Sequence, residues 1–355
     1  MNNQQELPPF IKTLIRDLIG TPNASDAFLI VGAPPTLRIM RKLIPVGKDP
    51  LSVDAIEQAL SNLLAPEEAE HLKREKSLDL GLELNGDRFR VNFYYQKDSP
   101  ALCIRRFYTK IPPLNSLGFE PTRLKPLINR RTGLILVTGP TGSGKTTTLA
   151  SIIDHFNQAR TYHVITIEDP IEYMHNHAQS LISQRELNRD TPSFAKGLKD
   201  ALRESPDTIL VGELRDNETA EVALRAAETG HLIITTLHTL GAQQSILRLV
   251  NSFQADLRDM VRTQLAACLA GVISQTLIPT TDGKLRLIYE ILEGTLPLAN
   301  IIRSGQEQMI LNEMVNNQHS PTINEQLDQL CFQTLITPEQ AVRHSPDPRG
   351  LKVYR

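Results

Sequence analysis

The fold predicted for the second half of the chain follows from residues 139–150, which read GPTGSGKTTTLA. Gly139, Gly144, Lys145 and Thr146 fit the pattern GxxxxGK[ST]. In such a loop the glycines let backbone N–H groups converge on phosphate oxygens, and the following helix adds its positive N-terminal end. The lysine reaches the β- and γ-phosphates, and the threonine hydroxyl binds Mg²⁺. The stretch therefore predicts a site for ATP and Mg²⁺.

The sequence on both sides of the loop supports this prediction. GLILVT before it has the composition of a buried strand, and TTTLASIIDHFN within and after it favours a helix, so strand, loop and helix follow in the required order. The alternative is a glycine turn that opens an ordinary helix. The predicted nucleotide-binding residues are Gly139, Pro140, Thr141, Gly142, Ser143, Gly144, Lys145, Thr146 and Thr147.

Further apolar runs, separated by stretches that favour helices, follow along the second half of the chain. GLILV, HVITI, DTILV and HLIIT are separated by stretches that favour helices. This order is typical of an α/β fold with a mostly parallel sheet and helices on its faces. The last part, residues 295–355, is predicted to consist mainly of helices and a polar tail.

The first hundred residues follow a different pattern. SLDLGLEL and DRFRVNFYYQ alternate polar and apolar residues across Asn85-Gly86, which predicts a β-hairpin. The other elements predicted for this part are a helix at 6–20, strands at 27–31, 36–40 and 101–107, and consecutive helices at 51–64 and 65–76.

A proline-rich segment, YTKIPPLNSLG, separates the two patterns and is predicted to be a linker. We therefore expect an N-terminal domain at 1–107, the linker at 108–118, an ATPase core at 119–294 and a helical C-terminal region at 295–355.

Composition and charge argue against several classes of protein and several kinds of site. A formal net charge of −2 gives no global basic field, so direct nucleic-acid binding is not expected. The first residues lack a signal peptide, and the longest apolar-rich stretch, 265–274, is too short to span a bilayer. The three cysteines have no CxxC spacing and predict neither a zinc site nor a disulfide framework. A cytoplasmic protein is expected.

A second acidic element points to hydrolysis. TILVGELRD at 208–216 is an apolar strand that ends in Gly212-Glu213, and we expect it beside the strand that leads into the loop. A carboxylate there can act on the water that attacks the γ-phosphate, or hold it through Mg²⁺. The alternatives are a solvated glutamate or one that pairs with Arg215.

Two more strand ends carry polar groups. ITIEDPIEY places Glu168, Asp169 and Glu172 together, and clustered carboxylates repel one another unless a cation or hydrogen-bond donors lie among them. They indicate Mg²⁺ or water organisation, or else an acidic surface loop. TGHLIITTLHT ends near His238, which would sense the γ-phosphate or bridge to a neighbouring subunit, or is simply a hydrogen-bonded histidine.

With these strand ends in place, the chain resembles the secretion-superfamily ATPases, and most closely the PilT-like retraction motors of type IV pili. GPTGSGKTTTLA is similar to that family's Walker A motif, IEDPIEY to its Asp box, ILVGELRD to its Walker B motif and TGHLIITTLHT to its His box. ASDAFLIVGAPPTLRI resembles the family's ASDLHLSAGLPPMIRV, and DRFRVN resembles its RFRVN strand. The resemblance covers roughly residues 20–340.

The resemblance implies roles for individual residues. It makes Glu213 the catalytic glutamate, with Glu168 and His238 as supporting polar groups. It also places Arg90 and Arg105 where the family has arginines that reach toward the γ-phosphate; without it they are simply charged residues on strands. The candidate magnesium ligands are Thr146, Glu168 and Glu213.

The resemblance further implies a PAS-like α+β domain followed by a RecA-like ATPase domain, assembled as a homohexameric ring. Such rings act on an inner-membrane platform protein, which is their only link to the membrane, and a paralogous motor ATPase can share the work. The expected function is ATP hydrolysis that drives pilus retraction and twitching motility.

Departures from the family pattern leave alternatives open. PLANIIRSG at 297–305 corresponds to the family's AIRNLIREG but has Ala299 and Ser304 in place of an arginine and a glutamate, and Phe28 replaces the ASDLH histidine. An accessory PilU-like ATPase or a DotB-like secretion ATPase would also fit. A nucleic-acid-stimulated RecA-like motor and a nucleotide-gated binding protein with negligible turnover are alternatives from other classes.

Overall fold

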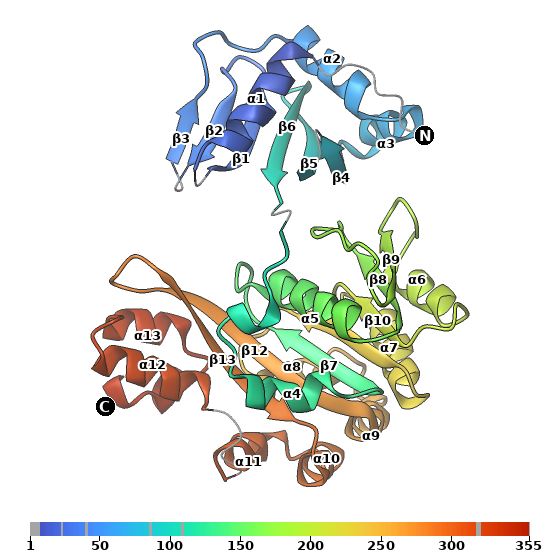
Figure 1. Cartoon of the computed structure of the whole chain (residues 1–355), viewed down its shortest axis with the longest axis vertical. Coiled ribbons are helices and arrows are strands. Elements are labelled where there is room, and N and C mark those ends of the chain that lie inside the picture. Colours follow the sequence, from blue (N-terminus) through green and yellow to red (C-terminus); the bar gives the residue numbers. More distant parts are fainter. Residues whose placement is uncertain are drawn as a thin grey trace. The chain divides into compact units, whose positions relative to one another are not determined.

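The computed structural model describes residues 8–22, 24–39, 42–84, 87–107, 110–316 and 321–354 (Figure 1). Two compact units make up the chain: Met1–Lys110 with Pro170–Met174, and Ile111–Asp169 with His175–Arg355. The three boundaries predicted from the sequence, and the PAS-like character of the first unit, stay predictions.

The first unit is built on an antiparallel sheet of six strands in the order β3-β2-β1-β6-β5-β4. Its strands are β1 (Ala24–Ile30), β2 (Thr36–Ile39), β3 (Lys42–Pro45), β4 (Ser77–Leu84), β5 (Asp87–Gln96) and β6 (Ser99–Arg106). Its helices are α1 (Pro9–Gly20), α2 (Val53–Leu63) and α3 (Pro66–Glu75). Strand β3 was not predicted from the sequence, because all four of its residues are exposed and no apolar alternation marks it.

Alternation of apolar and polar residues along β5 sets which face of this sheet is buried. Phe89, Val91 and Phe93 of β5 are fully buried and form one core with the apolar faces of α1 and α2. The intervening residues of β5 lie on the other face and are only partly buried. The predicted hairpin strands pair from Ser77 with Tyr94 to Leu84 with Asp87, whereas its turn, Asn85-Gly86, lies outside the described residues.

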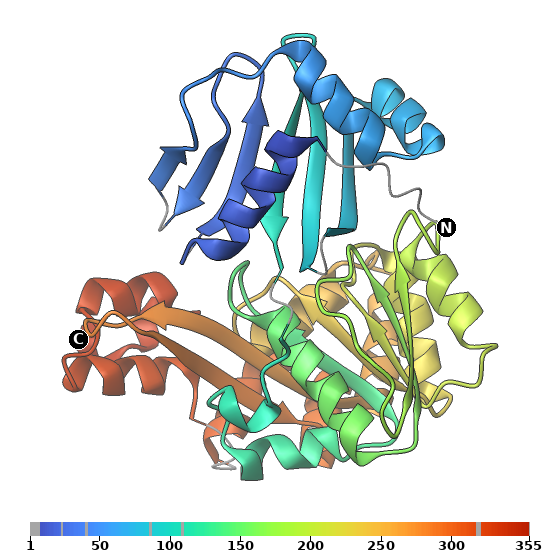
Figure 2. The same cartoon turned by 45° about the horizontal axis from the view of Figure 1, so that its top comes forward.

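The second unit contains a sheet of seven strands in the order β13-β12-β7-β11-β10-β8-β9 (Figure 2). The strands are β7 (Gly133–Thr138), β8 (His163–Glu168), β9 (Leu181–Glu186), β10 (Thr208–Val211), β11 (Leu232–Leu237), β12 (Leu269–Pro279) and β13 (Leu285–Glu293). Every neighbouring pair is parallel except β12 with β13. The predicted α/β fold with a mostly parallel sheet is confirmed.

Helices cover both faces of this sheet, as Figure 1 shows. The helices of this unit are α4 (Pro121–Ile128), α5 (Lys145–Ala159), α6 (Phe194–Ala201), α7 (Asn217–Glu228), α8 (Ala242–Asn251), α9 (Arg258–Cys268), α10 (Leu296–Arg303), α11 (Ile310–Asn316), α12 (Ile323–Phe332) and α13 (Pro338–His344). In β7, Ile135 and Val137 pack with α4 and α5, whereas Leu134 and Leu136 pack with the helices of the opposite face. Burial on both faces explains why the strand reads as one continuous apolar run.

Three strands of this sheet, β9, β12 and β13, were not predicted from the sequence. The apolar stretch around 265–274 contains the end of α9 and the start of β12, and β12 pairs with β13 over nine positions. The helices predicted beyond residue 295 are present, and α12 and α13 pack on Ile278 and Ile288, toward one end of this strand pair. Among the described residues, no helix is both long and apolar enough to cross a membrane.

Candidate active site

The glycine-rich loop runs from the end of β7 to the start of α5, as predicted. Gly139 has a φ of +149°, and a Cβ at this position would overlap the backbone oxygen of Gln275 in β12. Only glycine fits this close approach. The first helical hydrogen bond runs from the Thr148 N–H to the Gly144 carbonyl, so the loop delivers the first turn of α5 to the carboxyl edge of the sheet.

Gln275 is a structural partner of the loop that sequence reasoning missed. Its Nε2 donates to the Ser143 carbonyl at 2.7 Å, and both side chains are buried. Across the part of the chain that the structure describes, the buried Ser143 Oγ has no hydrogen-bond partner. Nothing in the sequence indicated this contact, because Gln275 is 132 residues away from Ser143 and lies in strand β12, which was not predicted.

Lys145 is buried against its own loop. Its Nζ donates to the Gly139 carbonyl at 2.9 Å and the Pro140 carbonyl at 3.1 Å, and lies 3.5 Å from His238 Nδ1. An ammonium group only donates hydrogen bonds, so Nδ1 of His238 is the acceptor in this contact. The three acceptors hold the lysine side chain at the mouth of the loop.

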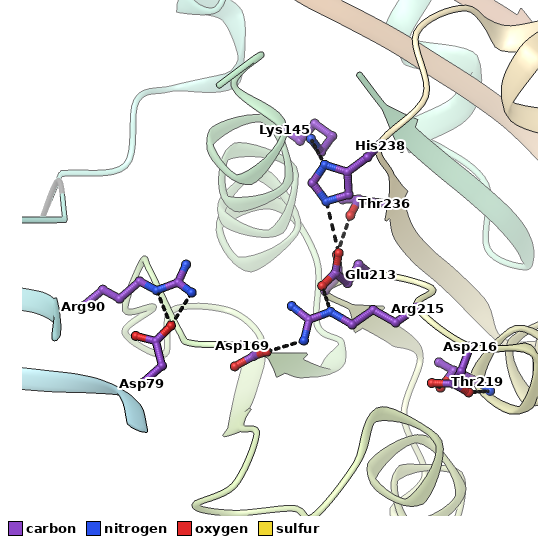
Figure 3. Close-up of polar contacts among 11 residues, drawn as sticks. Asp79, Arg90, Lys145, Asp169, Glu213, Arg215, Asp216, Thr219, Thr236 and His238 are labelled. Atoms are coloured by element: carbon purple, nitrogen blue, oxygen red, sulfur yellow. Dashed lines mark hydrogen bonds and ion pairs between the residues drawn. The ribbon is translucent and has the colours of Figure 1, made fainter. Parts of the chain in front are cut away.

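His238 connects the lysine to Glu213 (Figure 3). Its Nε2 lies 3.1 Å from Glu213 Oε2, and the lysine on Nδ1 leaves the proton on Nε2, which donates to the carboxylate. Burial lowers the pKa of His238, and the positive charges of Lys145 and Arg215 lower it further. The imidazole is therefore neutral at pH 7 and links the cation to the anion.

The position of Glu213 in the sheet corrects one expectation. Its strand, β10, was expected beside the loop strand β7, but β11 lies between them. Sequence order does not reveal sheet order, so the insertion of β11 could not be seen in advance. The insertion places His238, which follows β11, between Lys145 and Glu213.

Arg215 is the second partner of Glu213. Its Nε contacts Glu213 Oε1, and its Nη1 lies 2.7 Å from Asp169 Oδ2 (Figure 3). The pairing considered as an alternative for Glu213 therefore exists alongside the contact to His238. We call Lys145, His238, Glu213, Arg215 and Asp169 the strand-end cluster.

Hydrogen-bond donors contact two carboxylates at the end of β8, those of Glu168 and Asp169. Glu168 Oε1 accepts from Thr166 Oγ1 at 2.6 Å and from Gln184 Nε2 at 3.2 Å. Asp169 is held by Arg215, whereas Glu172 falls in the segment that groups with the first unit. Donors thus lie among the carboxylates, which is one of the two ways to relieve their repulsion.

Oxygen ligands for a magnesium ion are sparse. Within the described residues, no three His, Cys, Asp or Glu side chains are grouped so as to hold a metal ion. Thr146 lies half-buried in the first turn of α5, next to Lys145. A hydroxyl with few carboxylates suits Mg²⁺ that takes most of its ligands from phosphates and water.

Arg90 and Arg105 belong to the first unit and have carboxylate partners there. Arg90 Nε donates to Asp79 Oδ2 at 2.8 Å (Figure 3). Arg105 Nε lies 2.7 Å from Asp26 Oδ1. Register explains the arrangement: Arg105 of β6 lies opposite Asp26 on one side and opposite Arg90 on the other. We call Asp26, Arg105, Arg90 and Asp79 the arginine row; its two aspartates were missed because register cannot be read from one strand.

Comparison with known proteins places the chain in a family. The model of the type II/IV secretion system protein family matches residues 74–308. The type IV pilus ATPase PilU of Pseudomonas aeruginosa is 36% identical over 93% of this chain and 87% of its own length. The type IV pilus retraction ATPase PilT of the same organism is 38% identical over 88% of this chain and 90% of its own length.

A solved structure agrees with the sequence comparison. The crystal structure of the pilus retraction motor PilT with bound ADP matches with a TM-score of 0.87 and 43% identity, over 97% of this chain and 98% of that chain. The chain therefore belongs to the type II/IV secretion system protein family, as one of its PilT-like type IV pilus ATPases.

Proposed function

We propose that the chain hydrolyses ATP at the glycine-rich loop and uses the energy to retract type IV pili. The observation that carries the hydrolytic part is the hydrogen-bonded series from Lys145 through His238 to Glu213. It joins a phosphate-binding lysine to a carboxylate that can act on water, across three strand ends of one sheet. The ADP in the PilT crystal structure supports a nucleotide as the ligand.

In this proposal the residues of the loop bind the nucleotide and the strand-end cluster acts on water. Phosphate oxygens replace the Gly139 and Pro140 carbonyls as partners of Lys145, because a charged acceptor binds an ammonium more strongly. Glu213 orients the attacking water and takes up its proton. His238 Nε2 and Arg215 hold the two oxygens of that carboxylate in place, and Glu168 supports the same edge of the sheet.

Thr146, together with Glu213 and Glu168, is the proposed set of residues that hold Mg²⁺. When bound, the ion would neutralise charge on the β- and γ-phosphates. Arg90 and Arg105 are proposed to stabilise the transferring phosphoryl group, on the resemblance alone. Both arginines already have carboxylate partners, so phosphate would have to replace Asp79 and Asp26.

The biological role is inferred from the relatives. We propose a homohexameric ring at the cytoplasmic face of the inner membrane that acts on a platform protein of the pilus machinery. The support is the match to PilT, named as a pilus retraction motor, over nearly the whole chain. A PilU-like accessory role is the second candidate, because PilU matches 93% of the chain at 36% identity.

Cells whose chromosomal copy carries Glu213→Gln provide the test. The amide keeps the shape of the side chain but cannot accept the proton, so turnover of the purified variant should fall on the order of 10²–10⁴-fold while ATP binding is retained. Surface pili counted by electron microscopy should be in excess, and twitching should be lost. Bald cells would indicate pilus assembly, and unchanged piliation would indicate a redundant paralogue or a secretion role.

A further inference from the structure

A buried carboxylate that the proposed reaction does not use lies between the starts of two helices. Glu290 of β13 is 2% exposed. Its Oε1 accepts the backbone N–H of Ala242 at 2.6 Å, and its Oε2 accepts that of Ile323 at 3.1 Å. These are the first residues of α8 and α12. One side chain therefore caps a helix of the ATPase core and a helix of the C-terminal region.

The starts of α8 and α12 both favour a carboxylate as the acceptor of their N–H groups. The first turn of a helix has N–H groups without partners inside the helix and carries partial positive charge, which favours a carboxylate. Burial raises the pKa of Glu290, and the two N–H donors oppose that rise. If the carboxylate were removed, two buried N–H groups would lose their acceptors at once.

The helix start at Ala242 is directly connected to the strand-end cluster. Only three residues separate it from His238, and the second of these, Leu240, packs against the apolar cluster of α12 and α13. Gly241 donates its N–H to Ser274 Oγ at 2.7 Å, and Ser274 lies directly opposite Glu290 in the β12–β13 pair. Two successive N–H groups of the His238 loop, residues 238–242, are thus held by two cross-strand neighbours.

Two more contacts show how closely the loop is fitted. Gly241 has a φ of +97°, and a Cβ there would lie 3.3 Å from the Cβ of Pro346 in the C-terminal region. Ser245, one turn into α8, donates to Thr138 Oγ1 at 2.9 Å, and Thr138 directly precedes the glycine-rich loop. The same helix start therefore touches the C-terminal region on one side and the nucleotide-site strand on the other.

We propose that Glu290 is a positioning residue that couples the His238 loop to the C-terminal helices α12 and α13. A shift of His238 when nucleotide binds is transmitted through Ala242 and Glu290 to Ile323, and a force on the C-terminal helices returns to His238 by the same route. The inference rests on the proposed function in one respect, namely that ATP binds at the glycine-rich loop.

Hydrogen–deuterium exchange on the full chain tests the coupling, with a non-hydrolysable ATP analogue as the probe. In the wild type we expect the analogue to slow exchange at 139–147 and also to change exchange at 322–354. In Glu290→Gln, where the amide offers a donor to one of the two N–H groups, protection at 139–147 should remain and the change at 322–354 should fall at least twofold. The ratio of affinities for the ATP analogue and ADP should shift several-fold.

Asp328→Asn is the matched control. Asp328 is also buried and accepts the N–H groups of Lys352 and Val353, but it has no part in the Glu290 contacts. This variant should loosen the end of the chain while the coupling and the affinity ratio stay as in the wild type. A merely structural role for Glu290 predicts the same behaviour for both variants.

The outcomes separate the inference from the function on which it rests. No protection at 139–147 in the wild type means that the proposed nucleotide site is wrong. Protection there without any change at 322–354 overturns the coupling. The wild type alone gives this result, so it does not depend on whether a variant folds. An unaltered response in Glu290→Gln overturns the assignment to this residue.

Discussion

The strand-end cluster and the arginine row both pair arginine with carboxylate, but they are assembled in different ways. In the arginine row, Asp26, Arg105 and Arg90 occupy register-matched positions of adjacent strands. In the strand-end cluster, Lys145, His238 and Glu213 follow three different parallel strands, and no two of them are cross-strand partners. One group depends on antiparallel register and the other on the convergence of strand ends.

Because of this difference, the two groups differ in which side chains are fixed and which can change partner. Asp26 is almost completely buried while its partner Arg105 is about half exposed, so the aspartate is fixed and the arginine can change partner. In the strand-end cluster the fixed element is the sheet edge, and four of its side chains, Lys145, His238, Glu213 and Arg215, have partners on two sides. The first group is suited to releasing a cation to a ligand, and the second to holding a carboxylate still.

The largest effect is expected from Lys145→Ala. The variant removes the ammonium that contacts two loop carbonyls and His238. ATP turnover should fall on the order of 10³-fold or more. Measured turnover of the purified chain checks this, with Lys199→Ala as the control, because the Lys199 side chain is exposed on α6 and pairs with Glu218. Equal loss in both variants would contradict the assignment.

Arg90→Ala and Arg105→Ala ask whether the arginine row takes part in turnover. Loss of a guanidinium that binds the transferring phosphoryl group should lower kcat by roughly 10- to 100-fold and change KM by less than about threefold. Steady-state kinetics on each variant measures the two constants. If kcat and KM respond to the same extent, the arginines have structural roles and the comparison between the two groups loses its functional meaning.

A smaller effect distinguishes the fixed carboxylates of the two groups. Asp26→Asn removes the charge from an aspartate that pairs with both Arg105 and Arg38, so we expect a loss of about 1–2 kcal/mol in the free energy of unfolding, discounted for the exposure of Arg105. Asp169→Asn should cost less than about 1 kcal/mol, because Asp169 is more exposed. Urea unfolding of both variants tests the order, and a larger loss for Asp169→Asn would reverse it.

The smallest effect concerns pH. The pKa of His238 is lowered, so the imidazole stays neutral as the pH falls to the ordinary histidine value of about 6.5 and is protonated only below it. The unfolded chain takes up this proton at about pH 6.5, whereas the folded chain takes it up only at lower pH. Stability that is present at higher pH is therefore lost as the pH falls below about 6.5. Thermal unfolding midpoints from pH 8 to 5 should show this loss in the wild type and less of it in His238→Gln. A midpoint that rises as the pH falls through this range in the wild type, and does so less in His238→Gln, would contradict the lowered pKa.

Much of the second unit could be predicted because its signals are local. The loop needs glycines, a lysine and a threonine at fixed spacing, and GLILVT is apolar because β7 is buried on both faces. The edge strands β3 and β9 were missed, since exposed or partly exposed strands lack a continuous apolar run. Strand β12 is almost entirely buried, but it follows α9 directly, so no turn residues separate the helix from the strand in the sequence. Strand β13 begins with exposed residues. Glu213 and His238 were found as strand ends, whereas Arg215 and Gln275 were not found as members of the site.

The fold class, the nucleotide loop and the polar residues at the strand ends could be predicted from the amino-acid sequence, because each depends on residues close together in the chain. Three features became visible only in the folded chain: β11 separates β7 from β10, His238 lies between Lys145 and Glu213, and Glu290 joins α8 to α12. The physical reason is that strand order and register follow from packing of the whole core, and a hydrogen bond between distant residues forms only after that packing has placed its donor and acceptor together.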